Sequence, residues 1–248
     1  MKIIAHRGDS ANFPENTPEG WDAAYRNGAL AIEADIRLSS DGVCICAHDS
    51  DLRRLFDRPE RPEDLPLDDL LNLHNAEGGR IALLAEVLQH PVDNRCVLLD
   101  LKNESAPALE SIWAVIAEVV PAEQRHLVIA GCHTLDAVRF FAARAEAGSA
   151  TGGAAGILGF IPDPSEAEAF FHAGAQIIRL WERDVTAERV AHLQGLGAEV
   201  WVTTGWHGTA FGTGDTSAEN LAALAAAGVQ GVLVNDVAMT RTALEAIR

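Results

Sequence analysis

Short apolar runs alternate along the chain with longer stretches in which apolar residues recur every three or four positions. A run of about four to eight apolar residues predicts a buried strand, and the longer spacing predicts a helix with one apolar face. Strands that alternate with helices are typical of a parallel sheet. The pattern predicts nine strands, at 1–5, 31–38, 43–48, 95–102, 126–130, 155–161, 176–181, 199–204 and 231–234.

The stretches between these strands predict helices. They lie at 18–27, 64–73, 84–88, 109–120, 135–145, 165–173, 186–196, 217–227 and 238–247. Residues 43–48 are expected to pair back on the preceding strand as a hairpin, which leaves eight strands for the main sheet. We therefore predict an α/β fold, a (β/α)8 TIM barrel, as one domain over 1–248 with a small insertion at about 50–80. In such barrels the chemistry lies at the carboxyl ends of the strands.

The first predicted strand ends in a polar turn, His6-Arg7-Gly8. Gly8 allows the backbone to bend sharply. A histidine can move a proton near neutral pH, and an arginine offers a fork of donors that suits a phosphate or a carboxylate. Thr17 and Pro18 suit the N-cap and first position of the helix that follows. Taken alone, the His-Arg pair would also fit an ordinary surface turn.

Carboxylates lie on two further predicted strands. Glu33 and Asp35 are two residues apart, so they share one face of strand 31–38. Two carboxylates on one face suit a hard divalent cation. Asp100 and Lys102 share a face in the same way at the end of strand 95–102. Each pair alone would also fit a polar strand face or a salt-bridged strand end.

Residues 43–48 suggest a second kind of metal site. Cys44, Cys46 and His48 share one face of this strand, as ligands of a soft metal would. A structural zinc site needs a full set of protein ligands, and no further one is evident nearby. We therefore do not favour this alternative.

Composition narrows the function classes. The 248 residues are 48% hydrophobic, enough for the core of one large domain. A net charge of −17 disfavours nucleic acid or an anionic membrane as the main partner. No apolar run reaches the ~18 residues of a membrane span. The first strand begins at Met1 and the four cysteines form no disulfide pattern, so we expect no signal peptide and a cytoplasmic location.

Several of these motifs together resemble the glycerophosphodiester phosphodiesterase family, whose members are phospholipase-C-like TIM barrels. The resemblance spans nearly the whole chain and is strongest within residues 1–102. It rests on HRG-x-S at 6–10, PENT at 14–17, E-x-D at 33–35, His48-Asp49 and D-x-K at 100–102. It implies metal-dependent hydrolysis of small-molecule glycerophosphodiesters to sn-glycerol 3-phosphate and an alcohol.

The resemblance also implies roles for eight residues. A divalent cation, Mg²⁺ or Ca²⁺, is expected to be held by Glu33, Asp35 and Asp100. General acid and base catalysis is expected from His6 and His48, in an order that the resemblance leaves open. Contacts to the phosphate or to the rest of the substrate are expected from Arg7, Lys102 and Trp201.

The chain departs from the family pattern at four places. Asp100 stands where the family usually has a glutamate, and 55–59 stands where it usually has threonines. The family's Trp-Thr-x-Asn is Trp-Val-Thr-Thr at 201–204, and its Thr-Asp-x-Pro is Asn-Asp-Val-Ala at 235–238. These departures leave the head group of the substrate open.

Other functions are compatible with the same motifs. The chain could be a lysophospholipase D-like enzyme, a hydrolase of another small phosphodiester, a metal-dependent ester or amide hydrolase, or an inactive phosphate-binding barrel. The glycine-rich loop 205–216 could line the substrate mouth or lie free on the surface. His133, His172 and His192 are expected on helices or their edges, in solvent, and are assigned no role. The sequence predicts no oligomeric state.

Overall fold

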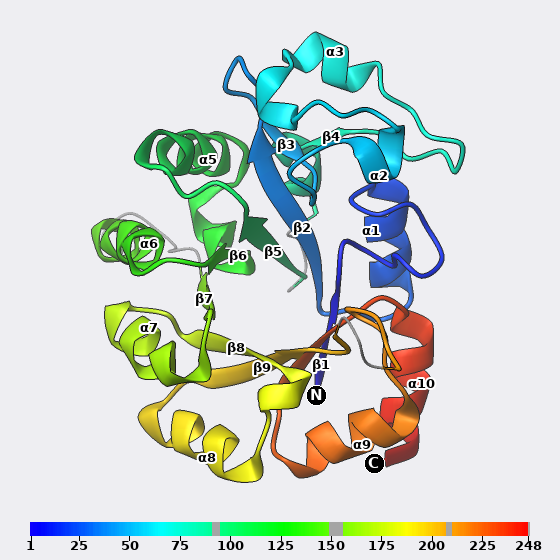
Figure 1. The fold of residues 1–248 in the computed structure, drawn as a ribbon. Coiled ribbons are helices and arrows are strands. Elements are labelled where there is room, and N and C mark those ends of the chain that lie inside the picture. The colour runs from blue at the N-terminus through cyan, green and yellow to red at the C-terminus, as the bar shows by residue number, and fades with distance from the viewer. Residues whose placement is uncertain (91–94, 149–155, 207–209, 248) are drawn as a thin grey trace.

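The computed structural model describes residues 1–90, 95–148, 156–206 and 210–247 and shows a closed barrel of parallel strands (Figure 1). The barrel strands are β1 (Lys2–Ala5), β2 (Ala31–Leu38), β5 (Cys96–Leu101), β6 (Val128–Cys132), β7 (Gly156–Phe160), β8 (Ile177–Trp181), β9 (Glu199–Thr203) and β10 (Gly231–Val234). They follow one another in sequence order, and β1 pairs with both β2 and β10, which closes the ring. The predicted (β/α)8 barrel is confirmed.

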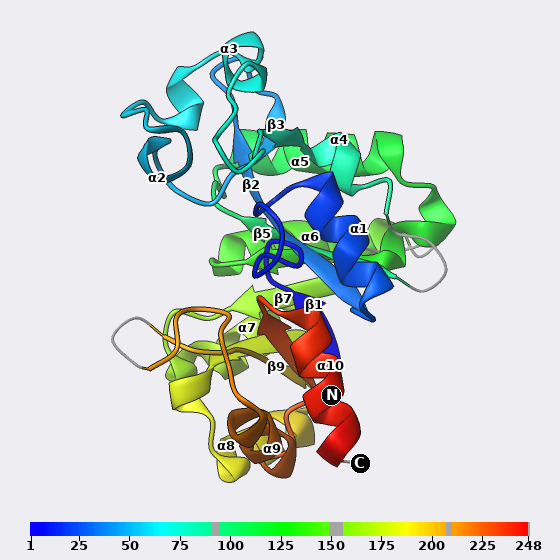
Figure 2. The same ribbon diagram turned by 90° about the vertical axis from the view of Figure 1, so that its right-hand side faces the viewer.

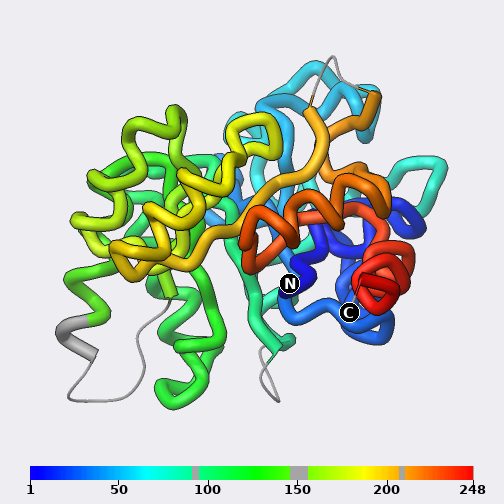
Figure 3. The backbone as a smooth tube through the Cα atoms, turned by 90° about the horizontal axis from the view of Figure 1, so that it is seen from below, coloured from blue at the N-terminus to red at the C-terminus, as the bar shows by residue number. Residues whose placement is uncertain are grey.

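Helices surround the barrel on its outer face (Figure 1), and Figure 3 shows the path of the same chain from below. They are α1 (Pro18–Arg26), α4 (Leu84–Val87), α5 (Ala106–Val119), α6 (Leu135–Gly148), α7 (Ala167–Ala173), α8 (Ala187–Leu196), α9 (Ala218–Ala226) and α10 (Val237–Ile247). Short 3-10 turns precede β6 and α7 and follow β8, at η2 (Ala122–Leu127), η3 (Pro164–Glu166) and η4 (Glu182–Asp184). None of the described helices is long and apolar enough to cross a lipid bilayer.

The capping residues were predicted correctly at one helix and wrongly at another. Thr17 caps α1 by accepting a hydrogen bond from the amide of Gly20, with Pro18 at the first position, as expected. The predicted helix at 165–173 begins at Ser165, which would suit its N-cap. Instead Asp163 accepts from the Ser165 amide, because Pro164 begins a 3-10 turn ahead of α7.

The predicted hairpin forms at β3 (Cys44–Cys46), which pairs antiparallel with β2. One further strand, β4 (Ala82–Leu83), was not predicted, and it pairs antiparallel with β3. Between them lie α2 (Arg53–Phe56), η1 (Pro62–Asp64) and α3 (Leu67–Leu71), beside the β2 edge of the barrel (Figure 2). This segment has its own apolar cluster, with Ile45 and Leu70 fully buried within it.

Residues along β2 alternate between two apolar cores, and this alternation places the acidic residues. Ile32, Ala34 and Ile36 face outward and pack in the large core between the sheet and the helices. Ala31 faces inward and packs with Leu98 and other residues in the core inside the barrel. Because side chains alternate along a strand, Glu33 and Asp35 also face into the barrel, as predicted.

Candidate active site

A cavity of about 680 Å³ lies at the carboxyl ends of the barrel strands. Six of the eight predicted site residues line it, namely His6, Arg7, Glu33, His48, Asp100 and Lys102. Asp35 lies directly beside it, within 3.0 Å of the Lys102 ammonium. The structure thus brings together seven of these residues from four strands, β1, β2, β3 and β5, and the turns after them. Trp201 lies elsewhere.

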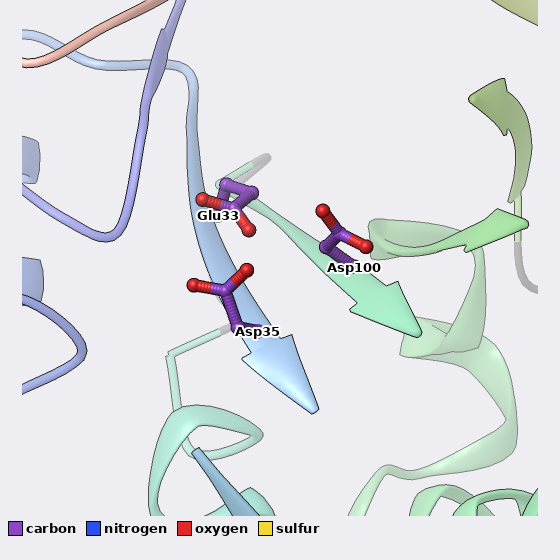
Figure 4. A group of neighbouring side chains, drawn as sticks. All are labelled: Glu33, Asp35 and Asp100. Atoms are coloured by element: carbon purple, nitrogen blue, oxygen red, sulfur yellow. The ribbon is translucent and has the colours of Figure 1, made fainter. Parts of the chain in front are cut away.

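The three carboxylates form one buried cluster. Glu33 and Asp35 project from β2, and Asp100 projects from β5, where it is the register partner of Asp35. Figure 4 shows the three groups facing one another across the two strands. One oxygen atom from each lies within 4.8 Å of the others. Among the described residues, Glu33 Oε1 has no hydrogen-bond partner although it is buried.

Two cations compensate part of this negative charge. The Lys102 ammonium lies 3.0 Å from Asp35 Oδ1 and 2.7 Å from Asp100 Oδ2, and Arg7 Nε lies 3.4 Å from Asp35 Oδ2. Burial alone would raise the pKa of Asp35, but the charges of Lys102 and Arg7 outweigh it and lower that pKa to about 2. Burial, followed by the charges of Asp35 and Asp100, raises the pKa of Glu33 well above its ordinary value.

The donor set of the cluster fits a hard divalent cation. All three groups offer carboxylate oxygens, which Mg²⁺ and Ca²⁺ prefer. The unpartnered Glu33 oxygen is a buried acceptor that such a cation would satisfy. A cation would also offset the mutual repulsion that raises the pKa of Glu33. The cluster could therefore hold a metal ion.

The turn after β1 is held in a left-handed conformation beside this cluster. Arg7 has a φ of 57° and Gly8 a φ of 85°. The Arg7 amide donates to Glu33 Oε2 at 2.7 Å. A Cβ on Gly8 would lie 2.9 Å from the backbone carbon of Gly20. The close approach of α1 therefore requires glycine at position 8.

Asn16 connects the Pro-Glu-Asn-Thr segment to the acidic cluster. Its side-chain amide donates to Asp35 Oδ2 at 2.9 Å, and its Oδ1 accepts from the Asp35 backbone amide at 3.1 Å. Both bonds are buried. Asn16 thus fixes the position of Asp35, and Thr17 caps the helix beside it.

His6 has a defined tautomer. Its Nδ1 lies 2.8 Å from Asn235 Oδ1. The other side of that amide, Asn235 Nδ2, donates to Thr213 O and to Asp215 Oδ1, which fixes the orientation of the amide. His6 Nδ1 therefore carries the proton, and Nε2 has a free lone pair. Burial, reinforced by the charge of Arg7, lowers the pKa of His6 from 6.5 to about 4.

His48 follows β3 and also lines the cavity. Its Nδ1 lies 2.8 Å from Asp49 Oδ1, so Nδ1 donates to a carboxylate. Arg54 in turn donates to Asp49 and to both oxygens of Glu15. This chain of ion pairs connects the segment after β3 with the loop before α1. Cys44 and Cys46 pack in the main core instead, and they form no metal cluster with His48 among the described residues.

His133 and Arg179 are among the residues of the cavity wall that the sequence did not predict. His133 was expected in solvent, but its Nε2 lies 2.7 Å from Asp100 Oδ1 and its ring stacks on Phe160. The strand before it ends at Cys132 rather than at 130, so His133 lies at a strand end. Arg179 also lines the cavity, from β8. The alternation of β8 was the available signal, because it places Arg179 and Trp181 on one face.

Trp201 was expected at the substrate, and the structure places it inside the barrel, away from the cavity lining. It is 2% exposed, and its indole N–H donates to Glu199 at the amino end of the same strand. Trp181 and Trp206 line the cavity in its place and pack edge to face. Thr213 of the glycine-rich loop also lines it, whereas residues 207–209 of that loop lie outside the described residues.

Solved structures of other proteins share this fold over nearly the full length of both chains. A glycerophosphodiester phosphodiesterase from Thermotoga maritima superposes with a TM-score of 0.74, covering 97% of this chain and 96% of that one at 21% identity. A phosphodiesterase from Oleispira antarctica, solved in complex with the product sn-glycerol-3-phosphate, superposes with a TM-score of 0.80, covering 99% and 97% at 19% identity.

Sequence relatives match about half of the chain or less. Human glycerophosphodiester phosphodiesterase 1 is 32% identical over 131 residues, which are 48% of this chain and 39% of the human protein. A glycerophosphodiester phosphodiesterase from Caldanaerobacter subterraneus is 35% identical over 94 residues, 35% of this chain and 39% of that protein. The match thus spans about two fifths of the length of these relatives. Residues 6–144 match the Glycerophosphoryl diester phosphodiesterase family, and the chain belongs to this family.

Proposed function

We propose that the protein is a metal-dependent phosphodiesterase that hydrolyses glycerophosphodiesters to sn-glycerol 3-phosphate and an alcohol. The observation that carries this proposal is the convergence of three carboxylates, two cations and two histidines on one cavity. Membership of the family supports the same reaction. A cavity of about 680 Å³ suits a small-molecule substrate.

Glu33, Asp35 and Asp100 are the proposed ligands of the metal, which we take to be Mg²⁺ or Ca²⁺. When bound, the cation supplies a positive charge for the phosphoryl oxygens and stabilises charge that develops during the reaction. Asp100 is one methylene shorter than glutamate. It still reaches the cluster, because its oxygen lies within 4.8 Å of those of Glu33 and Asp35. Its side chain is held from two sides by Lys102 and His133.

Arg7 and Lys102 are proposed to neutralise the remaining phosphate oxygens. Both line the cavity, and both already lie against carboxylates of the cluster. Burial disfavours the charged form of Lys102, but Asp35 and Asp100 outweigh it and raise the pKa of Lys102 above its ordinary value. Lys102 therefore stays a cation at neutral pH and is available to an anionic substrate.

The histidines are proposed to divide the proton transfers, with His6 as the base. The low pKa of His6 keeps its ring neutral at physiological pH, with the lone pair on Nε2. His6 Nε2 accepts the proton of the attacking hydroxyl, which belongs to water or to the substrate itself. His48 donates a proton to the leaving alkoxide, and the hydrogen bond from its Nδ1 to Asp49 orients the ring for this role. When water is the attacking molecule, His6 gains one proton and His48 loses one, so the protein's total number of protons is unchanged.

Product release from two diesters tests the proposal. Glycerophosphocholine and glycerophosphoethanolamine are incubated with the protein, and glycerol 3-phosphate is measured with Mg²⁺, with Ca²⁺ and with EDTA. We expect metal-dependent release that His6→Gln reduces by about 100-fold or more. The control is His192→Gln, because His192 is exposed on α8 and pairs only with Glu168 among the described residues. Equal rates in the two variants, or no release under any condition, would contradict the proposal.

A further inference from the structure

Arg179 faces the acidic cluster across the cavity. It lies on β8, which is four strands from β2 in either direction around the closed barrel. Its side chain and Glu33 line the same cavity. The site therefore has an acidic wall on β2 and β5 and a cation on the opposite wall, a feature that the proposed reaction does not use.

Aromatic rings hold Arg179 in place but give it no acceptor. Its guanidinium carbon lies 4.0 Å from the ring centre of Trp181 and 5.0 Å from that of Phe160. The residue is 5% exposed, and its Nε and Nη1 atoms are buried. Within the described part of the chain neither nitrogen has a hydrogen-bond partner, and Arg179 forms no ion pair. Such a buried, unpaired cation is costly unless an anion completes the site.

Arg179 is charged under ordinary conditions. Burial lowers its pKa to about 10, while the charges of Asp100 and Asp184 act in the opposite direction. The side chain is therefore still a cation at neutral pH. Its planar fork suits a carboxylate or a phosphate, and the rings of Trp181 and Phe160 limit its movement.

We propose that Arg179 binds a second anionic group, a carboxylate or a phosphate, on the alcohol arm of the substrate, so that the site prefers diesters with an acidic head group. The glycerol arm of the substrate carries no second anionic group, so this group must lie on the alcohol arm. The inference rests on the proposed function, because it places the reacting phosphate at Glu33, Asp35 and Asp100. The cavity of about 680 Å³ is large enough for such a molecule.

Two matched pairs of diesters test the preference. Glycerophosphoserine differs from glycerophosphoethanolamine by one carboxylate, and glycerophosphoinositol 4-phosphate differs from glycerophosphoinositol by one phosphate. We expect a ratio of kcat/KM of about tenfold or more in favour of the anionic member of at least one pair. The pair that shows it identifies the anion. Arg179→Gln should bring the ratio close to one, and Arg179→Lys should retain part of it.

Arg183→Gln is the matched control. Arg183 lies on η4, a few residues beyond Arg179, and its side chain is 53% exposed and does not line the cavity. It should keep the ratio. Three results would overturn the inference: a ratio near one for both pairs in the unmodified protein, an equal loss for both members of a pair in Arg179→Gln, or the same fall in ratio in Arg183→Gln.

A binding measurement separates this inference from the proposed function. The melting temperature of the EDTA-treated protein is measured with each member of the two diester pairs. A larger rise with glycerophosphoserine, lost in Arg179→Gln, supports the anion site even where no diester is hydrolysed. Equal rises with the members of both pairs would overturn the anion site even where hydrolysis is observed. The melting temperature of each variant without ligand shows that it is folded.

Discussion

The main chain of Arg7 holds one carboxylate of the cluster while its side chain neutralises another. The Arg7 amide donates to Glu33 Oε2 at 2.7 Å, and its Nε lies 3.4 Å from Asp35 Oδ2. The φ of 57° at Arg7 sets the backbone for the first contact. This conformation is uncommon for a residue with a side chain. At Arg7 it allows the turn after β1 to contact both acidic residues of β2.

Glu33→Gln should separate the stability of the metal-free protein from its response to metal. Removing one of three crowded carboxylates should raise the melting temperature in EDTA, because the repulsion that raises the pKa of Glu33 disappears. A cation at about 100 times its Kd should stabilise the unmodified protein by about 2.7 kcal/mol and the variant by much less. Thermal unfolding with and without Mg²⁺ or Ca²⁺ measures both. Glu118→Gln, at an exposed position of α5, is the control. A metal response as large in Glu33→Gln as in the control would contradict the assigned ligand.

His6 should make the protein less stable as the pH falls below 6.5. The folded pKa of about 4 lies below the unfolded value of 6.5, so the unfolded chain binds more protons between these values. This contribution is fully present above pH 6.5 and is lost as the pH falls toward 4. Relative to His6→Gln, the unmodified protein should lose about 2 kcal/mol between pH 8 and pH 5. Urea unfolding at the two pH values measures it, and parallel pH dependence in both proteins would refute the low pKa.

Asn235→Ala should reduce turnover without unfolding the protein. The Asn235 side chain fixes the His6 tautomer and takes a second bond from Ser10. Without it the His6 ring can rotate, and we expect kcat to fall by about 10- to 100-fold with a smaller change in KM. Asn220→Ala, on α9 and outside the cavity lining, should behave as the unmodified protein. An unchanged kcat in Asn235→Ala would show that the orientation of His6 does not depend on this contact.

Gly8→Ala should destabilise the fold more than Gly42→Ala. Both glycines have a φ near 80°, at 85° and 82°, so both substitutions introduce similar backbone strain. Only at position 8 would the added Cβ meet backbone, 2.9 Å from Gly20; at position 42 nothing among the described atoms lies within 4 Å. We expect a loss of about 1 kcal/mol for Gly42→Ala and about 3 kcal/mol for Gly8→Ala. Free energies of unfolding in urea provide the comparison, and equal losses would show that α1 can move away.

The sequence predicted the barrel because its strands and helices have distinct spacings. The alternation at 31–38 placed Glu33 and Asp35 on one face, and the structure has β2 over the same residues. The spacing of residues within one strand or helix does not predict contacts between segments that are distant in the sequence. The bonds from Asn16 to Asp35 and from His6 to Asn235 depend on how the ring closes.

The errors at the site have local causes. A strand boundary two residues too early placed His133 on a helix edge rather than beside Asp100. The family pattern on β9 predicted a substrate contact for Trp201, but its side chain packs inside the barrel, while Thr203 on the same face of the strand lines the cavity. The sequence predicted no role for Arg179, which is one charged residue within a strand. Its lack of an acceptor is visible only in the folded protein.

The most direct test of the central claim is the metal dependence of hydrolysis at the acidic cluster. EDTA-treated protein is assayed on glycerophosphoethanolamine, and Mg²⁺ or Ca²⁺ is then added back in steps. The account predicts a negligible rate in EDTA, saturable recovery in the unmodified protein and little recovery in Glu33→Gln. A full rate in EDTA, or equal recovery in both proteins, would contradict it.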